Sequence, residues 1–313
     1  MSPELHIAVA LDGAGSHPDA WRAPGARPAE LFTPAYWLSL VREAERGRLD
    51  FVTIEDSYNI TGHAGRVQGR LEALLIAARI APVTKGIGIV PAVAVAATEP
   101  FHVSTQVATL DYLSRGRAGW QVLPGEALDE AADHVEVVRR LWDSWEDDAV
   151  IRDVGTGRFI DRDKLHYVDF TGRHFSVRGP SITPRPPQGQ PLVATVASGP
   201  VAAADVVFVD SPASAAAVRA DAPAAKIFVD VAVSSDDGPP QRLADRLLDW
   251  RDAGVDGFRL HPGVLAADLT AIVDGLLPIL RERGAFRREY TATTLRGHLG
   301  LHRPANRYAK ATA

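Results

Sequence analysis

The 313-residue sequence predicts a (β/α)8 barrel, in which eight parallel strands alternate with helices around a closed sheet. Short runs rich in β-branched residues alternate with longer segments of helical period along most of the chain. Eight such repeats are expected, and eight is the number that closes this barrel. An open doubly wound sheet is the alternative. It usually has fewer repeats and a glycine fingerprint after its first strand, whereas here LDGAG (11–15) leads into a proline-rich loop.

The first half of the chain contains four strand–helix pairs. The first helix has clear boundary signals, because Thr33 and Pro34 open it and Gly47 follows its end. The apolar runs predict strands at 5–11, 49–55, 86–95 and 116–123. The segments of helical period predict helices at 33–45, 70–81, 100–114 and 127–145.

The alternation breaks between residues 146 and 190, where the sequence is polar and rich in turns. We interpret this stretch as a shortened insertion on a single barrel domain of residues 1–313, with a hairpin at HYVDFTGRHFSV (166–177). Strands are expected again at 191–198, 205–210, 226–233 and 256–262, with helical segments at 201–204, 213–221, 239–254 and 264–284. A C-terminal arm of residues 284–313 follows, and its last part (302–313) is expected to pack on a neighbouring subunit or form a loose tail.

The composition excludes several classes of function. The chain is 46% hydrophobic and 23% charged, which is ordinary for a globular enzyme. It has no cysteine, so disulfides, thiolate nucleophiles and iron–sulfur clusters are excluded, and its ten histidines lack metal-ligand spacing. A net charge of -5 argues against nucleic-acid or membrane partners. Without a signal peptide or a membrane-length apolar run, the sequence predicts a cytoplasmic enzyme with no metal.

Polar residues at the carboxyl ends of the strands are candidate ligand contacts, because barrel active sites lie there. Gln121 ends an otherwise apolar strand, so its amide should meet a ligand or another polar group. Asp56 either orients a ligand or caps its own loop. Ser198 and Gly199 either offer backbone N–H groups to a phosphate or cap a short helix.

The last strand adds two basic candidates, Arg259 and His261. They are either basic groups at the mouth of the barrel or a salt-bridged pair that holds its rim.

Longer strings resemble the luciferase-like flavin monooxygenases, in particular the nitrilotriacetate, pristinamycin and dibenzothiophene-sulfone branch. They cover nearly the whole chain and include YWLSLVREAERGRLDFVTIEDSY (36–58), TEPFHVSTQVATLDYLSRGRAGWQV (98–122) and FTGRHFSVRGPSITPRPPQGQPLV (170–193). The resemblance implies a barrel of the bacterial-luciferase type that forms a homodimer or larger homo-oligomer. It also implies oxygenation of a small organic substrate with O2 and reduced FMN, which a separate NAD(P)H-dependent flavin reductase supplies.

The resemblance also implies where the flavin and the reacting groups lie. Flavin contacts are expected at six positions, namely Asp56, Ala92, Ala94, Gln121, Ser198 and Gly199. Tyr58 and His102 are candidates for polar groups near the reacting oxygen, although His102 also fits a role in capping or packing its helix.

The sequence departs from the family pattern where the flavin would bind. Ala92, Ala94 and Val95 stand where the family carries hydroxyl groups, and Gln121 stands in place of asparagine. Leu128 replaces a tyrosine that reaches the phosphate. The chain is therefore either an FMN-dependent monooxygenase with altered phosphate contacts or a homologue that has lost the flavin site. The latter would be a non-catalytic partner or a flavin-independent enzyme. Use of a deazaflavin is a third possibility.

Overall fold

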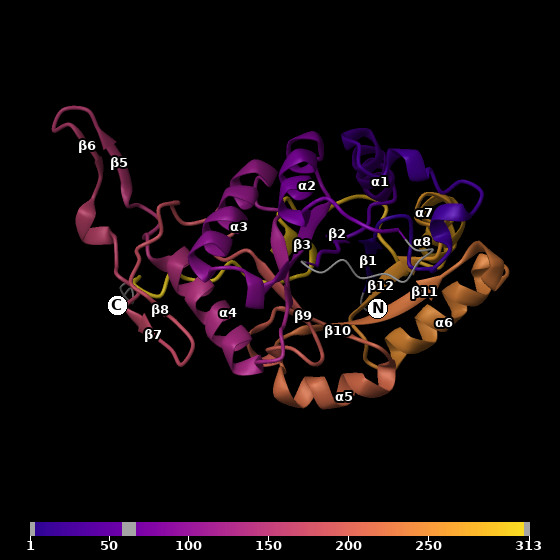
Figure 1. Ribbon diagram of the computed structural model, residues 1–313. Helices are drawn as coiled ribbons and strands as arrows, with labels where there is room; N and C mark the ends of the chain where they lie inside the picture. The colour runs from indigo at the N-terminus through magenta and orange to yellow at the C-terminus, as the bar shows by residue number, and fades with distance from the viewer. Residues whose placement is uncertain (1–3, 58–66, 310–313) are drawn as a thin grey trace.

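The computed structural model describes residues 4–57 and 67–309 and shows a closed barrel of eight parallel strands surrounded by helices (Figure 1). The predicted (β/α)8 barrel is confirmed. Around the barrel, neighbouring strands follow the order β1 (His6–Leu11), β2 (Phe51–Ile54), β3 (Gly88–Ala94), β4 (Gly119–Leu123), β9 (Leu192–Val196), β10 (Val206–Val209), β11 (Lys226–Val233) and β12 (Gly257–Pro262).

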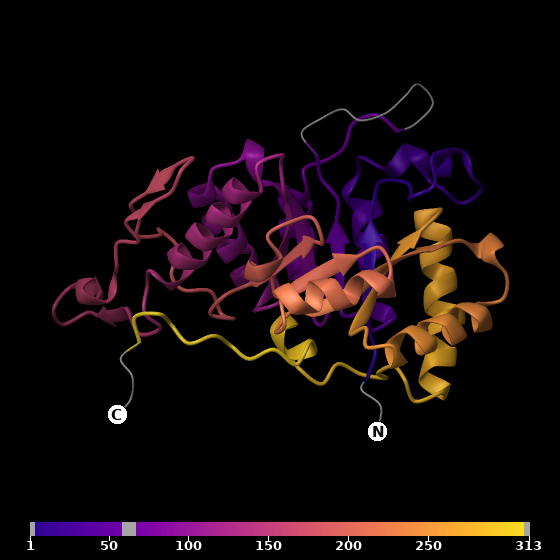
Figure 2. The ribbon, with the colours of Figure 1, turned by 90° about the horizontal axis from the view of Figure 1, so that it is seen from below.

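The helices surround the sides of the barrel, except the last, which lies at its amino end (Figure 2). They are α1 (Pro34–Arg46), α2 (Ala73–Ile80), α3 (Pro100–Ser114), α4 (Leu128–Asp143), α5 (Pro212–Asp221), α6 (Pro240–Asp252), α7 (Leu265–Ala271), the π-helix η8 (Ile272–Leu276), α8 (Leu277–Glu282) and α9 (Leu295–His298). Short 3-10 turns are η1 (Ala20–Arg22), η2 (Pro28–Glu30), η3 (Ala81–Val83), η4 (Val95–Ala97), η5 (Arg162–Lys164), η6 (Val201–Ala203) and η7 (Ser235–Asp237). None of the helices in the described ranges is both long enough and apolar enough to cross a membrane.

Three helical segments differ from the sequence expectation. α2 begins at Ala73 rather than near residue 70, because the Glu72 carboxylate accepts the Leu75 N–H at 2.6 Å and caps the helix there. The segment expected after β9 is only the 3-10 turn η6. The segment expected at 264–284 is interrupted by the π-helix η8.

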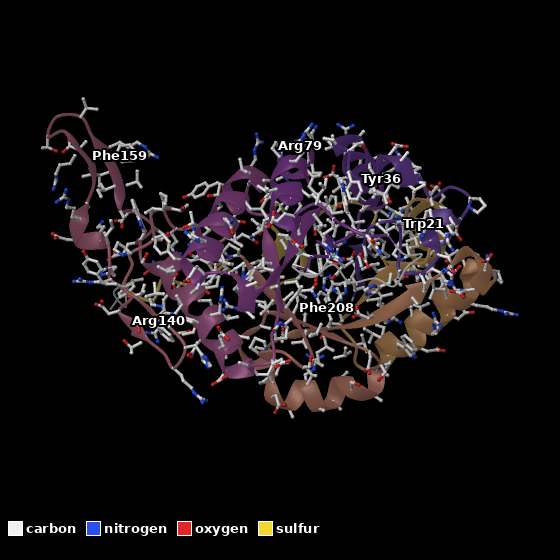
Figure 3. The ribbon with its side chains drawn as sticks, viewed as in Figure 1. Trp21, Tyr36, Arg79, Arg140, Phe159 and Phe208 are labelled. Atoms are coloured by element: carbon white, nitrogen blue, oxygen red, sulfur yellow. The ribbon has the colours of Figure 1, made fainter. Side chains whose placement is uncertain are left out.

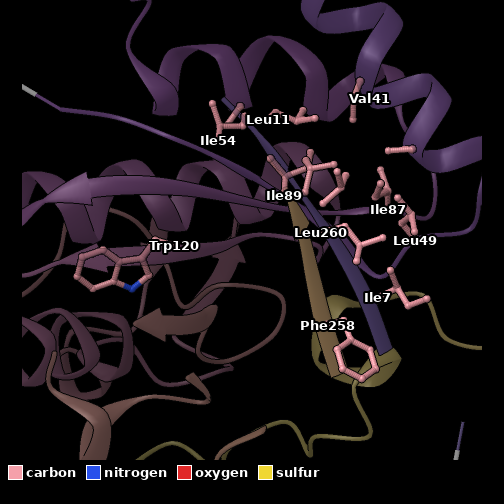
Figure 4. Packing of buried hydrophobic residues seen from close by; sticks show 14 of the residues in the cluster. Ile7, Leu11, Val41, Leu49, Ile54, Ile87, Ile89, Trp120, Phe258 and Leu260 are labelled. Carbon is pink, nitrogen blue, oxygen red and sulfur yellow. The ribbon is translucent and has the colours of Figure 1, made fainter. Parts of the chain in front are cut away.

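Two apolar layers hold the barrel together. The outer layer lies between strands and helices, where Ile7, Ile89 and Leu260 of the strands face residues such as Val41 of α1 (Figure 4). The inner layer fills the lumen and includes Phe51, Phe208 and Phe228, with the Phe51 and Phe228 ring centroids 5.5 Å apart. Along each strand, successive side chains point in turn to the helices and to the lumen. Only the lumen-facing side chains can reach the barrel mouth.

The insertion carries two hairpins. The predicted hairpin is confirmed by β7 (Phe170–Thr171) and β8 (Ser176–Val177), which pair antiparallel. A second hairpin, formed by β5 (Val150–Asp153) and β6 (Arg158–Ile160), was not expected from the sequence and projects away from the barrel (Figures 1 and 2).

The C-terminal arm packs on its own chain, so the expectation of a loose tail is wrong for residues 302–309, whereas packing on a neighbouring subunit stays a prediction. It runs along the amino end of the barrel (Figure 2), where Leu295 and Leu299 join the inner layer. Farther along, the Asn306 side-chain amide donates to the Asp143 and Trp145 carbonyls at 2.9 and 2.8 Å. These buried contacts bind the arm to the start of the insertion.

Candidate active site at the barrel mouth

A buried arginine spans the lumen near the carboxyl ends of the strands. Arg259 of β12 is 3% exposed and donates to both carboxylate oxygens of Asp230 on β11 at 2.6 and 2.7 Å. Its Nη1 donates to Gln121 Oε1 on β4 at 2.8 Å. The guanidinium carbon lies 3.6 Å from the ring centroid of Phe208, which is in the barrel interior (Figure 3). Arg259 thus joins strands from opposite sides of the barrel.

Strand register explains this pairing. Asp230 and Arg259 are partners in the β11–β12 ladder, and both side chains face the lumen. Two residues farther along β12, His261 Nε2 lies 3.0 Å from the same Asp230 carboxylate. Burial alone would raise the pKa of Asp230, but hydrogen bonds from Arg259 and His261 hold it below the ordinary value. Asp230 therefore remains ionised and fixes both basic side chains.

Two further carboxyl groups lie at the rim of the mouth, Asp12 after β1 and Glu55 after β2. Leu11 pairs with Ile54 in the ladder, so these two acids follow adjacent positions. Both line a cavity of about 180 Å³ whose wall includes Trp21 and Trp37.

The two acids differ from Asp230 in their ionisation. Burial raises the pKa of Asp12, against the opposing charges of Arg70 and His261. Burial also raises the pKa of Glu55, although Arg259, at 3.6 Å, opposes this shift. The rim therefore favours protonated carboxyl groups more than bulk water does.

Replacing Glu55 with glutamine is expected to raise the melting temperature at pH 8, on the order of a few degrees. A carboxyl group with a raised folded pKa stabilises the fold while protonated, and this contribution is lost as pH rises through that pKa. The gain should shrink at pH 4, where wild-type Glu55 is protonated. Thermal unfolding at both pH values tests this, with the exposed Glu289→Gln as control. An equal gain at both pH values would show that ionisation of Glu55 does not cause it.

Three of the proposed flavin contacts lie together on two neighbouring strands. Gln121 faces the lumen, is 2% exposed and pairs in register with Ala92, while Ala94 pairs with Leu123. Gln121 was expected to meet a ligand or another polar group, and in this structure it meets Arg259.

The other proposed contacts lie on the strands to either side. Asp56 follows β2, and its carboxylate accepts the N–H groups of Ser57 at 2.6 Å and Ala73 at 2.8 Å, so it ties this loop to α2. Ser198 and Gly199 follow β9. Ser198 is exposed, and the Gly199 N–H donates to the Val196 carbonyl at 2.8 Å.

The two candidates for groups near the reacting oxygen are placed differently. His102 is exposed in the first turn of α3, which follows β3. Tyr58 lies outside the described residues. The roles of all these residues in binding or catalysis stay predictions.

Sequence reasoning missed Asp230, the group that organises the mouth. Arg259 and His261 were expected as either free basic groups or a salt-bridged pair, and the structure shows the salt-bridged arrangement. The available signal was a single acid inside the apolar strand KIFVDVAV (226–233), since a carboxylate there needs a partner.

The residues at the barrel mouth fit the ring of an FMN molecule but not its phosphate. Ala92, Ala94 and Gln121 lie on the lumen side of two neighbouring strands and could pack against a flat ring, but Ala92 and Gln121 are only 1% and 2% exposed. The three-residue turn η6 and the engaged Gly199 N–H offer little to a phosphate. The cavity of about 180 Å³ is also smaller than the roughly 300–1,000 Å³ of typical ligand sites. The described residues alone therefore do not make a complete FMN site, and they contain no group of three side chains arranged to hold a metal.

Comparison with known proteins gives a consistent result. A family model described as luciferase-like monooxygenase matches residues 14–209. The N-acetyl-S-(2-succino)cysteine monooxygenase of Bacillus subtilis (strain 168) is 30% identical, with 98% of this chain and 99% of the relative covered. One of the two pristinamycin IIA synthase chains of Streptomyces pristinaespiralis is 38% identical over 87% of this chain and 91% of its own.

A solved structure shows the same fold. The riboflavin lyase crystallised with modified FMN and riboflavin superposes with a TM-score of 0.86 at 22% identity, over 97% of both chains.

The two relatives align differently with this chain. The alignment with the Bacillus protein runs over 435 positions, so at least 122 of them fall opposite gaps in the 313 residues of this chain. The alignment with the 38%-identical synthase chain runs over only 275 positions. The chain therefore resembles the Bacillus relative over its whole length but lacks many of that protein's residues.

Proposed function

The chain belongs to the luciferase-like monooxygenase family, and on that premise we propose that it is a flavin-dependent monooxygenase that uses reduced FMN and O2 to oxygenate a small organic substrate. A separate NAD(P)H-dependent reductase would supply the reduced flavin in the cytoplasm. The observation that carries the proposal is family membership over nearly the whole chain, together with a polar cluster at the carboxyl end of the barrel, where such enzymes react.

In this proposal, bound reduced FMN supplies the electrons that activate O2, and the chain's own residues bind, orient and protonate. Ala92, Ala94 and Gln121 would form the wall for the flavin ring. Arg259 holds the Gln121 carbonyl, so the amide keeps a fixed orientation. Glu55, whose pKa is raised by burial, would be the group that exchanges a proton at the rim.

Four further proposed residues that the structure describes follow β2, β3 or β9. Asp56, Ser198 and Gly199 are the proposed flavin contacts outside β3 and β4. Tyr58 and His102 are the proposed polar groups near the reacting oxygen.

The first test is an anaerobic titration of the purified chain with oxidised FMN and with photoreduced FMN, followed by flavin absorbance and fluorescence. Saturable binding of the reduced form, followed by slowed reoxidation when O2 is admitted, would support the proposal. Absence of binding to either form in the micromolar range would contradict a self-sufficient enzyme.

Replacing Gln121 with alanine is expected to weaken binding of reduced FMN about fivefold to tenfold, because one amide contact contributes roughly 1 kcal/mol. The same titration measures the change. Gln121→Asn should restore part of the affinity, and Gln106→Ala on the exposed face of α3 serves as control. If Gln121→Ala binds reduced FMN as tightly as wild type, Gln121 does not contact the flavin.

A second candidate function is that of an accessory chain in such an enzyme. It is favoured by the one-sided fit to FMN and by the 38% identity to a protein that is named as one subunit of a synthase. In that case the chain would pair with a longer family member that holds the flavin. Co-expression of the two chains, followed by size-exclusion chromatography with light scattering, tests this. A one-to-one complex that binds FMN when this chain alone does not would favour the second function over a homo-oligomeric enzyme.

A further inference from the structure

A second cavity lies outside the barrel lumen, between α6 and the continuous α7–η8–α8 helix. The helices themselves are neighbours on one side of the barrel (Figure 1). Its volume is about 630 Å³, within the range of roughly 300–1,000 Å³ that organic ligands occupy in proteins. Much of its wall is apolar, with contributions from Val233, Pro240, Leu243, Ile272 and Leu276. The cavity is distinct from the mouth, because Val233 lines it from the outer side of β11 whereas Asp230 faces the lumen.

The charged side chains that line this cavity are three aspartates and two arginines, and only the arginines have no hydrogen-bond or ion-pair partner among the described residues. Arg242 and Arg246, four residues apart on α6, both line it. Among the described residues no acidic side chain forms an ion pair with either guanidinium, and Arg246 only stacks over Trp250 at 5.3 Å.

The acidic side chains in the lining already have partners. Asp237 accepts the Ser234 N–H at 2.9 Å, and Asp268 accepts the Val264 N–H at 2.7 Å. Asp274 pairs with Arg46 at 2.7 Å. The two arginines are therefore the charged side chains of the lining whose donor groups have no acceptor among the described residues.

The wall opposite α6 contains the π-helix η8, which is an independent sign of a site. π-Helical turns are rare in proteins and occur frequently where a helix serves a function. Here η8 carries Gly275, and a Cβ added at this glycine would lie 3.5 Å from Pro240 of α6. The two walls approach each other at this point, and the cavity is bounded there.

We propose that this cavity binds an amphipathic organic anion. The apolar body of the ligand packs against Leu243, Ile272 and Leu276, and its carboxylate or phosphate group is held by Arg242 and Arg246. Arginine suits such a head group because its guanidinium forms paired hydrogen bonds with carboxylate and phosphate oxygens. The site is separate from the proposed flavin site and does not depend on flavin binding.

The test is isothermal titration of the full chain with decanoate, decyl phosphate and decylammonium, with Trp250 fluorescence as a second readout. Saturable binding of one anion per chain is expected, with a change in Trp250 fluorescence that Trp250→Phe removes. The Arg242→Gln/Arg246→Gln variant should weaken anion binding at least about tenfold, since hydrogen bonds to charged groups contribute roughly 1.5–3 kcal/mol. Comparing decanoate with decyl phosphate shows which head group the site prefers.

Two further variants control for loss of charge and for misfolding. Ala271 is exposed in the cavity wall, so Ala271→Trp should fill the space and abolish binding while both arginines remain. Arg251→Gln, on the same helix but outside the lining, should bind as wild type does.

Several results would overturn the proposal. These are equal binding of decylammonium, unchanged binding by the double arginine variant, and absence of saturable anion binding. A dimer that dissociates in Ala271→Trp would place a second copy of the chain in the cavity and would likewise overturn it.

Discussion

Arg259→Ala is expected to lower the free energy of unfolding by about 3–5 kcal/mol, the cost of breaking a buried ion pair by removing one partner. The guanidinium is 3% exposed and neutralises Asp230, so its loss leaves a carboxylate in the lumen without its main counter-charge. Gln121 also loses its donor, and Phe208 loses a cation over its ring. Urea unfolding at pH 7, followed by circular dichroism, measures the change.

Two comparisons identify the cause of the Arg259→Ala effect. Arg22→Ala breaks an ion pair whose side chains are more than half exposed, and should cost less than about 1 kcal/mol. The double variant Arg259→Met/Asp230→Asn should cost less than Arg259→Ala alone, because it leaves no unpaired charge in the lumen. A loss below about 1 kcal/mol for Arg259→Ala would mean that water solvates the Asp230 carboxylate, whose side chain is 29% exposed, well enough to replace Arg259, and that the cluster does not hold the mouth together.

The fold could be predicted from sequence because it depends on local patterns. The runs that form β1, β10 and β11 are apolar and β-branched, and helices such as α3 begin at a proline, as expected. The first residue of a helix was harder to predict where a side-chain hydrogen bond caps the helix. Glu72 starts α2 three residues later than the apolar pattern suggests, because its carboxylate satisfies a free N–H at the helix start.

The site could be predicted only in part, because its contacts join distant parts of the chain. The strand pattern placed Gln121 and Arg259 at the carboxyl ends of their strands, but these residues are 138 positions apart. Their direct hydrogen bond depends on how the barrel closes, which no local pattern specifies. Asp230 was missed for the same reason, since its partner Arg259 lies on the next strand.

The C-terminal arm shows the same limit. Its polar sequence is typical of an exposed tail, but the Asn306 amide finds two backbone carbonyls more than 160 positions earlier in the chain. A polar side chain can be buried when such partners exist. The structure shows these partners, and the local sequence does not.

Asp50→Asn is expected to lower the free energy of unfolding by about 3–5 kcal/mol at pH 7. Asp50 is fully buried at the amino end of the barrel, where its carboxylate accepts the Ile7 N–H at 2.7 Å and pairs with Arg287 of the C-terminal arm at 2.5 Å. Asparagine keeps the shape of the side chain but leaves the buried Arg287 without its main counter-charge. Urea unfolding measures the loss, and Asp245→Asn, which breaks an exposed pair with Arg283, serves as control.

The pH dependence of Asp50→Asn separates loss of charge from loss of packing. Burial would raise the pKa of Asp50, but His6 and Arg287 outweigh burial and hold it below the ordinary value. A carboxylate with a lowered folded pKa stabilises the fold above the ordinary aspartate pKa of about 3.9, and this contribution is lost as pH falls through the folded pKa. The difference between wild type and Asp50→Asn should therefore shrink in acidic solution, as pH falls through the folded pKa of Asp50. A difference that persists at the lowest pH at which the fold survives would assign the effect to packing rather than to the Asp50–Arg287 ion pair.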